Sequence, residues 1–497
     1  MRIVEALNLG FGSRKHWLNS YPNERRRSGW MMLPVMACLL VIAADASAQP
    51  AAAVSPAALG PYEYEVKPDH EAFLPFHPRK APKPGPLLLQ PGDRLAICGD
   101  SITEQKMYSR IIETYLTVCV PELKITARQY GWSGEKTDGF LHRMDQDCLP
   151  FHPTIATLAY GMNDSRYRPF DVTNGQWYED HYTAIVRRFK DAGARVVVGS
   201  PGCAGKIAAW VKVRSGDLQD HNLNLCSLRD IAIGVAKQED VRFADIFWPM
   251  YQAQVFAPAQ HGASPQQGAS PQQGASPQQG ASQEKSYEVA GHDGIHPGWP
   301  GHVIMAWSFL RAMGLPGDIG TIAVDLSRST ATATDGHHID SFSDGILTVT
   351  SARYPFCAEG DLHSDTSVLS GMTLVPFAED LNRFVLKVAD ADHDRYRLRW
   401  GDAEKEFTSA QLTEGISLAV EFPRNPFSAA FERVDNAVAA KQAYETVQVK
   451  TVFHGPLAKA DRKQVVAETE AKRKPLADAI ANAMVPVTHV IEITAID

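Results

Sequence analysis

Short apolar runs that alternate with longer stretches of helical spacing constrain the fold of this chain more than any other feature. The apolar runs cover residues 94–98, 154–160, 195–199 and 241–247. Between and after them, apolar residues recur at helical spacing over about 107–118, 177–192, 223–236 and 301–313. Buried strands that are separated by helices form parallel sheets with both faces covered. The pattern therefore predicts a three-layer α/β domain over residues 93–316.

The pattern changes after Leu315. Short β-prone runs separated by turns predict a β-rich domain over residues 317–425, and they lie at 321–326, 345–350, 383–388, 396–400 and 416–422. Helical spacing then returns in two blocks around 447–453, which predicts a mostly helical region over residues 426–497 with an apolar, β-branched end. This C-terminal third carries no catalytic motif, so packing and sugar binding both stay open as its role.

The N-terminus carries the pattern of an export signal. Three arginines at 25–27 precede an apolar run over 30–44, and the small residues Ala46, Ser47 and Ala48 follow. We therefore expect residues 1–48 to be a signal peptide and the protein to be periplasmic or extracellular. The apolar run is shorter than the roughly 20 residues that cross a bilayer, so no stable membrane span is expected.

Two segments have compositions that are typical of flexible chain. Residues 49–92 are rich in proline and alanine and lack a steady period, so we expect a linker there. Inside the α/β domain, residues 261–283 contain the hexapeptide Gly-Ala-Ser-Pro-Gln-Gln three times. This repeat has too little apolar surface to fold on its own, so we expect a flexible surface loop.

Charge and cysteine content exclude several kinds of partner and site. The formal net charge is −8 and no dense run of Lys and Arg follows the first 48 residues, so nucleic acid is not an expected partner. None of the later cysteines forms a Cys-x-x-Cys pair, which disfavours a structural zinc or redox site. Their even number permits disulfides without fixing the pairs, and they are Cys98, Cys119, Cys148, Cys203, Cys226 and Cys357.

The first motif with catalytic potential is Gly-Asp-Ser at 99–101. It follows the apolar run 94–98 directly and precedes a helical stretch. The carboxyl end of a strand that opens into a helix is where open α/β sheets place their reactive groups. Ser101 can present its hydroxyl to solvent there and point its own N–H toward a pocket. The same tripeptide also fits an ordinary turn.

The second motif is Asp-Gly-Ile-His-Pro at 293–297. An acid three residues before a histidine can orient the imidazole through Nδ1, which leaves Nε2 of His296 free to take a proton from a serine. Alternatively, Asp293 caps the coming helix and His296 is solvated. The spacing of His292 and His296 also suits a metal, with His302 nearby. Because no thiolate or second acidic cluster completes that set, we expect no metal.

Two further motifs supply hydrogen-bond donors. Asn163 follows the apolar run 154–160, and its uncharged amide is suited to donate to a developing oxyanion. Gly134 lies in Gly-Trp-Ser-Gly-Glu at 131–135, where a glycine lets a backbone N–H approach a ligand closely. An Asn-Asp turn and a plain glycine turn are the corresponding structural alternatives.

In this order along the chain, the four motifs resemble the signature blocks of the SGNH (GDSL-type) hydrolase family. The resemblance covers about residues 94–313, under half of the chain. It implies a flavodoxin-like domain without a cofactor, with Ser101 as nucleophile, His296 as general base and then acid, and Asp293 as its orienting carboxylate. It also implies an oxyanion hole made by the N–H of Ser101, the N–H of Gly134 and the side chain of Asn163.

The resemblance implies a serine esterase that forms an acyl-enzyme. Exported family members with an added β-rich module resemble polysaccharide deacetylases, so short-chain acyl esters, such as acetyl groups on polysaccharide, are the favoured substrates. Lysophospholipase, arylesterase and thioesterase activities stay open, as does a non-catalytic carbohydrate-binding protein that retains the fold. A phosphate-binding loop at 199–206 is rejected, because its glycine spacing is one residue too long and Ile207 replaces the required Ser or Thr. That segment is a wall of the ester site or a plain turn.

Overall fold

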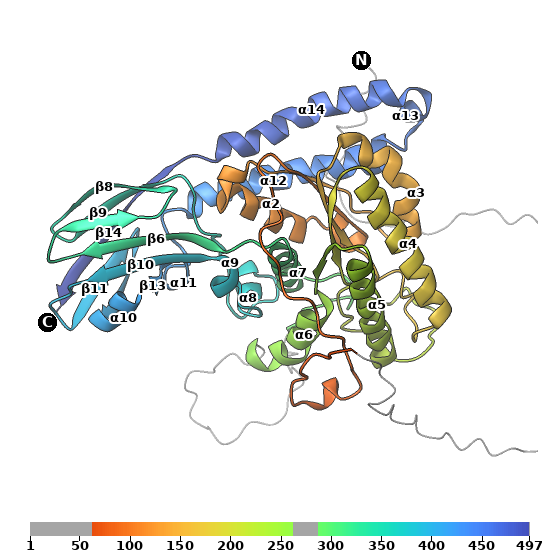
Figure 1. Cartoon of the computed structure of the whole chain (residues 1–497), viewed down its shortest axis with the longest axis horizontal. Coiled ribbons are helices and arrows are strands. Elements are labelled where there is room, and N and C mark those ends of the chain that lie inside the picture. The colour runs from red at the N-terminus through yellow and green to blue at the C-terminus, as the bar shows by residue number, and fades with distance from the viewer. Residues whose placement is uncertain (1–61, 262–286, 497) are drawn as a thin grey trace, which may run out of the picture. The chain divides into compact units, whose positions relative to one another are not determined.

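A five-stranded parallel sheet forms the centre of the first part of the chain (Figure 1). The structure is a computed structural model that describes residues 62–261 and 287–496. The strands pair in the order β2-β1-β3-β4-β5, and they are β1 (Arg94–Gly99), β2 (Thr126–Gln129), β3 (Ile155–Ala159), β4 (Arg195–Gly199) and β5 (Arg242–Ala244). This flavodoxin-like order places a topological switch point between β1 and β3, where such sheets bind ligands.

Helices cover both faces of this sheet, which confirms the predicted three-layer α/β architecture. Leu95 and Ile97 of β1 pack with residues of α2 and α7, whereas Ala96 and Cys98 pack with residues of α3, α4 and α5. Both faces are apolar because both are buried. The helices are α1 (Ser101–Glu104), α2 (Tyr108–Val118), α3 (Thr137–Asp147), α4 (Val172–Asp191), α5 (Leu218–Gln238), α6 (Phe247–His261) and α7 (Trp299–Ala312).

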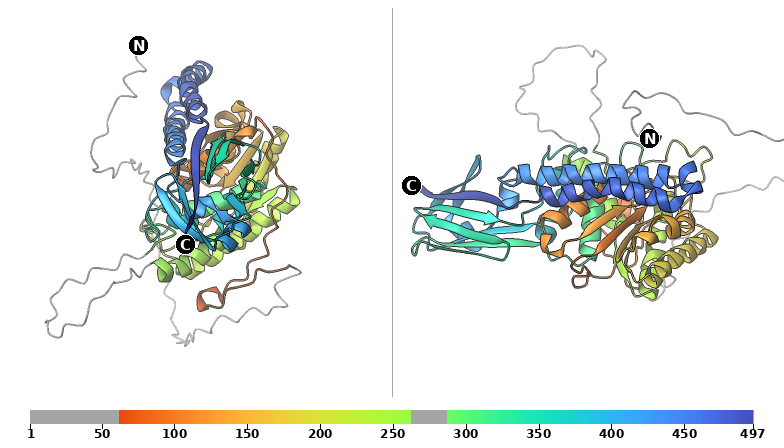
Figure 2. Two further views of the ribbon diagram at one scale, coloured as in Figure 1. Left: turned by 90° about the vertical axis from the view of Figure 1, so that its left-hand side faces the viewer. Right: turned by 90° about the horizontal axis from the view of Figure 1, so that it is seen from above.

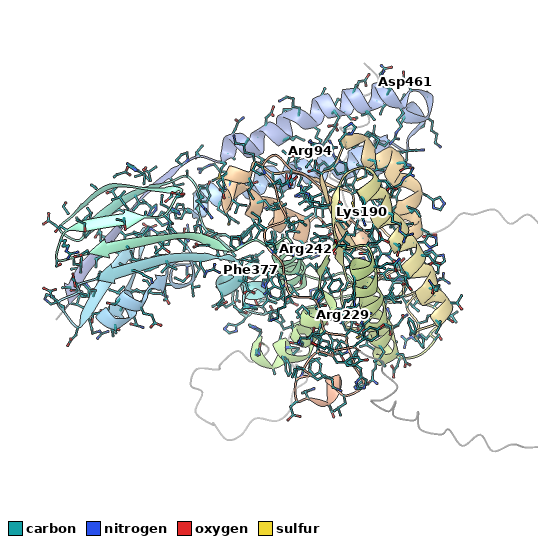
Figure 3. The ribbon with its side chains drawn as sticks, in the orientation of Figure 1. Arg94, Lys190, Arg229, Arg242, Phe377 and Asp461 are labelled. Atoms are coloured by element: carbon teal, nitrogen blue, oxygen red, sulfur yellow. The ribbon has the colours of Figure 1, made fainter. Side chains whose placement is uncertain are left out.

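Residues 62–92 pack against the α/β domain, which differs from the linker expected over 49–92. Phe73 and Phe76 are fully buried, and Phe73 lies edge-on to Trp248 of α6 with ring centroids 5.5 Å apart. Arg229 of α5, labelled in Figure 3, donates to the carbonyl oxygen of Arg79 at 2.7 Å. Aromatic anchors in a proline-rich stretch therefore hold this segment in place despite its lack of period.

The β-rich part consists of two sheets whose inner faces pack together. One has the order β13-β10-β6-β7 and the other β12-β11-β14-β9-β8. Phe384 and Trp400 meet between them with ring centroids 6.0 Å apart. The strands are β6 (Asp318–Asp325), β7 (Thr330–Ala333), β8 (His337–Ser343), β9 (Ile346–Ser351), β10 (Arg383–Ala389), β11 (Arg395–Trp400), β12 (Ala403–Thr408), β13 (Ile416–Ser417) and β14 (Val487–Ile496).

The strand predicted over 416–422 is mostly wrong. Only Ile416 and Ser417 form a strand, and α11 (Leu418–Glu421) follows. Leu418 and Phe422 are buried four residues apart, a spacing that suits one face of a helix as well as a strand. The other short helices of this part are α8 (Val368–Met372), α9 (Phe377–Leu381) and α10 (Ser409–Glu414).

Two long helices of the C-terminal region lie side by side against the α/β domain (Figure 2). They are α12 (Ser428–Val447) and α14 (Arg462–Ala483), and a π-helical turn (Gln448–Val452) and α13 (Pro456–Ala460) connect them. Lys441 of α12 is 1% exposed and forms ion pairs with Glu113 of α2 at 2.8 Å and with Glu445 at 3.0 Å. After α14 the chain enters β14, which pairs with β11 and β9.

Several expectations concern residues that the structure does not describe. The signal peptide expected over 1–48 lies outside the described residues, as does nearly all of the repeat at 261–283. No helix within 62–261 and 287–496 is long and apolar enough to cross a membrane. In these same ranges all six cysteines are buried free thiols, and no disulfide joins them. Burial raises the pKa of Cys98, so this thiol stays protonated.

Candidate active site

Ser101 is the first residue of α1, directly after β1. Asp100 caps this helix, because its Oδ1 accepts the N–H of Ile102 at 2.9 Å. Gly99 is required at the turn, because a Cβ there would lie 2.1 Å from Oγ1 of Thr103 and 2.8 Å from the carbonyl oxygen of Ala159. The strand–turn–helix geometry thus puts Ser101 at the β1/β3 switch point of the sheet.

Ser101, His296 and Asp293 lie in one hydrogen-bonded chain. Oγ of Ser101 is 2.8 Å from Nε2 of His296, and Nδ1 of His296 is 2.7 Å from Oδ2 of Asp293. The second carboxylate oxygen of Asp293 accepts the backbone N–H groups of Ile295 and His296 at 2.9 and 2.8 Å. Partial burial acts to raise the pKa of Asp293, but these hydrogen bonds outweigh it and the pKa is lowered. The carboxylate of Asp293 is therefore ionised, and its hydrogen bonds hold it in one orientation.

The 293–296 loop packs tightly on the segment 199–206. Gly294 has φ +79°, and a Cβ there would lie 2.4 Å from the backbone nitrogen of Lys206. The N–H of Gly205 donates to the carbonyl oxygen of Gly294 at 2.8 Å. The 199–206 segment therefore supports the loop that carries His296.

The loop at 131–135 lies beside the nucleophile. Gly131 packs on α1, because a Cβ there would lie 2.2 Å from the backbone nitrogen of Glu104. Gly134 has φ +73° and faces open space, which leaves room for a ligand atom. The next residue, Glu135, is anchored by buried hydrogen bonds from Arg143 at 2.6 Å and from Tyr160 at 2.9 Å.

Asn163 lies between the serine turn and this loop, and both of its amide hydrogens have protein acceptors. Its Nδ2 donates to Oδ2 of Asp100 at 3.2 Å and to the carbonyl oxygen of Glu135 at 3.1 Å. Its Oδ1 accepts the hydroxyl of Tyr167 at 2.8 Å. Asn163 can therefore donate to an oxyanion only after it gives up one of these two hydrogen bonds. Burial raises the pKa of Asp100 to about 7.

Two aromatic residues lie beside His296 and Asn163, and the sequence pattern does not reveal either of them. The ring of Trp210 lies 5.6 Å from that of His296, and Tyr167 meets Trp210 edge-on at 6.1 Å. Trp210 is 46% exposed, which is unusual for so large an apolar side chain. An aromatic residue in an irregular loop has no periodic signal, so only the fold brings it to His296.

A cavity of about 450 Å³ borders the other side of the 293–296 loop. His296, Trp299 of α7 and Thr366 are among its lining residues. Thr366 belongs to the segment between β9 and α8, so a part of the chain outside the predicted α/β domain reaches the edge of the site. This contribution too is invisible in the sequence, because it depends on tertiary packing.

The three histidines considered for a metal have separate roles. Nδ1 of His292 contacts Glu288 at 2.6 Å, whereas Nε2 of His302 contacts Gln105 at 3.1 Å. Burial lowers the pKa of His302 to about 3, so this imidazole is neutral. Across the described part of the chain, no group of three or more His, Cys, Asp or Glu side chains is arranged to hold a metal ion.

Comparison with known proteins agrees with this geometry. Residues 97–304 match the model of the GDSL-like Lipase/Acylhydrolase family. No protein of curated function is significantly similar in sequence. A gut microbial diltiazem-metabolizing enzyme shares 20% identity with a TM-score of 0.63, over 84% of this chain and 100% of that one. Because the match extends beyond the α/β domain, the two proteins share a fold that includes C-terminal elements.

Two smaller solved structures match only part of the chain. An acetylxylan esterase from Geobacillus stearothermophilus shares 18% identity over 46% of this chain and 97% of that one, with a TM-score of 0.34. An alpha/beta hydrolase from the metagenome of Lake Arreo shares 19% identity over 46% and 98%, also with a TM-score of 0.34. The family match confirms the resemblance carried by the four motifs. Residues 97–304 therefore form a domain of the GDSL-like lipase/acylhydrolase family, and the protein is an ester-bond hydrolase.

Proposed function

We propose that the protein hydrolyses acyl esters through an acyl-enzyme on Ser101. Oγ of Ser101 attacks the carbonyl carbon while Nε2 of His296 takes its proton, and His296 then protonates the departing alcohol. Water, deprotonated by His296, attacks the acyl-serine, and His296 returns the proton to Oγ of Ser101 as the acid leaves. The 2.8 Å contact between Ser101 and His296 is the observation that carries this proposal. Asp293 holds Nδ1 of the imidazole and stabilises its charged form.

The N–H groups of Ser101 and Gly134 and the amide of Asn163 form the proposed oxyanion hole. Asn163 donates to the oxyanion when it gives up its bond to Asp100, which at 3.2 Å is the longer of its two bonds. Protonation of Asp100 favours this exchange, because a neutral carboxyl is a weaker acceptor than a carboxylate. The pKa of about 7 makes both forms of Asp100 accessible near neutral pH.

For the substrate, we propose short-chain acyl esters on polysaccharide, acetyl groups above all. Trp210 presents an exposed ring beside His296, and aromatic faces of this kind pack on the apolar faces of sugar rings. The imidazole of His296 is 28% exposed, so an ester attached to a bulky chain can reach it. Export to the periplasm or the medium is part of this proposal, and the size of the precursor and the mature protein in cell fractions tests it.

Turnover by wild-type protein and Ser101→Ala tests the proposal. We expect p-nitrophenyl acetate and acetylated xylo-oligosaccharides to be hydrolysed by the wild type, with and without EDTA, and by Ser101→Ala not at all. Trp210→Ala should raise KM for the oligosaccharide and leave KM for p-nitrophenyl acetate nearly unchanged. Near-normal turnover by Ser101→Ala would exclude the mechanism. Saccharide binding without ester turnover by the wild type would instead favour the non-catalytic alternative.

A further inference from the structure

The C-terminal region contacts the serine turn through a charged side chain. Lys450 lies in the π-helical turn after α12, and its Nζ donates to both carboxylate oxygens of Glu104, at 2.8 and 2.7 Å. Glu104 is the last residue of α1, the helical turn that begins with Ser101. A π-helical turn widens the helix locally, and such turns occur frequently at functional sites. Lys450 therefore reaches the serine turn from a distant part of the chain.

Glu104 also forms hydrogen bonds with the loop that carries Gly134. Its Oε2 accepts both the backbone N–H of Ser133 at 2.5 Å and the hydroxyl of Ser133 at 2.6 Å. Burial acts to raise the pKa of Glu104, but the hydrogen bonds from Lys450 and Ser133 outweigh it, so the pKa is lowered. The ionised carboxylate thus joins the C-terminal region to the residue directly before Gly134.

Other contacts between the C-terminal region and the loop lie before Ser133 in the sequence. The ring of Trp132 meets His454 edge-on at 4.9 Å, and Nζ of Lys450 lies 5.7 Å from the centre of the Trp132 ring. On the strand that leads into the loop, Gln129 donates to Oγ1 of Thr446 of α12 at 2.6 Å. Oε1 of Gln129 in turn accepts the N–H of Gly131. The C-terminal region therefore holds the part of the loop that precedes Gly134.

We propose that Lys450 is a positioning residue of the esterase, which orients the N–H of Gly134 toward the oxyanion through Glu104 and Ser133. This inference rests on the proposed role of Gly134. Gly134 can adopt the positive φ that the loop needs, but glycine also leaves the backbone flexible. A contact from outside the loop is therefore required to fix the direction of the Gly134 N–H. Oxyanion stabilisation depends on donors that are held in place before charge develops.

Lys450→Met tests this role, because it keeps the length of the side chain and removes its charge. We expect kcat for p-nitrophenyl acetate to fall about tenfold, since a misaligned donor costs less than the 10²–10³ of a lost one. KM should change less than about twofold, because the donor acts mainly on the transition state. The Ki of an alkylboronic acid, whose tetrahedral adduct on Ser101 places an anionic oxygen in the hole, should rise by the same factor as kcat falls.

Three further variants make the result decisive. Lys450→Arg should keep most of the activity, and Lys459→Met, an exposed lysine on α13, should match the wild type. Glu104→Gln keeps an acceptor for Ser133 and loses the ion pair, so it should resemble Lys450→Met, and the double variant should be no worse than either. Unchanged kcat and Ki in Lys450→Met, or fully additive losses in the double variant, would overturn the proposal. If Ser101→Ala were inactive in the same experiments, the proposed esterase function would stand and only the proposed role of Lys450 would fall.

Discussion

Asn163 is the residue on which the proposed oxyanion hole can be tested most directly. Removal of one such donor typically lowers kcat by about 10²–10³ and leaves KM nearly unchanged, because the bond strengthens as charge develops. We expect this result for Asn163→Ala. Asn163→Asp should be worse, because a carboxylate has no N–H and repels the oxyanion. Steady-state kinetics with p-nitrophenyl acetate measure both, and a change confined to KM would make Asn163 a substrate contact.

The ionisation of Asp100 should make stability depend on pH. Burial raises its pKa to about 7 in the folded protein, against about 3.9 in an unfolded chain. Between these values the folded state binds more protons, so the Asp100 contribution to stability falls as pH rises from about 4 to 7. Asp100→Asn removes the titration and keeps a side chain that can cap α1. As pH rises from about 4 to 7, the Tm of the wild type should therefore fall relative to that of Asp100→Asn. If the two proteins showed the same dependence of Tm on pH, the raised pKa of Asp100 would be contradicted.

At the scale of residues, the sequence predicts well what local motifs encode. Ser101, Asp293 and His296 come together at hydrogen-bond distances, because a strand end and a rigid loop determine where each side chain points. Trp210 and Lys450 could not be predicted. Each reaches the site only through tertiary packing, and neither lies in a motif or a periodic stretch.

At the scale of elements, amphipathic periodicity predicts long helices and buried strands but not short ones. The stretches expected to form α2, α4, α5 and α7 do so, with boundaries shifted by a few residues. The short helix α11 replaces most of an expected strand because a few apolar residues satisfy both periods. The sequence pattern does not predict α3. This helix lacks a clear apolar stripe, because it buries Arg143 and Asp147 along with Phe140 and Met144.

Strand β14 allows a matched test of the β-rich part. Ile491 is fully buried between the two sheets, whereas its neighbour Val490 is 39% exposed on the opposite face. Ile491→Ala should lower the free energy of unfolding by about 2–5 kcal/mol, as is typical for a buried isoleucine. Val490→Ala should cost under about 0.5 kcal/mol, as exposed substitutions usually do. Urea titrations give both values, and equal losses would show that β14 does not have the burial described.

At the scale of the whole molecule, a buried ion cluster joins the α/β domain to the C-terminal helices. Lys441→Met would remove the cation that pairs with Glu113, whereas Glu445 would keep its ion pair with Arg473 at 2.6 Å. Breaking a buried pair such as Lys441–Glu113 typically costs about 3–5 kcal/mol. Lys450→Met should cost only about 0–1 kcal/mol, because that pair is partly exposed. Unfolding in urea compares the two. Similar losses for both variants would contradict the assignment of Lys441 as a stability residue and Lys450 as a positioning one.

The place of β14 also affects how the chain acquires its fold. β14 pairs between β11 and β9, yet it is synthesised after both of them and after the two helices that cross the α/β domain. Until it arrives, β11 and β9 each expose an unpaired edge, and such edges are prone to aggregate. The β-rich part therefore cannot mature as the ribosome releases it. Chaperones that shield strand edges should matter most for this protein in the interval between the synthesis of β11 and that of β14.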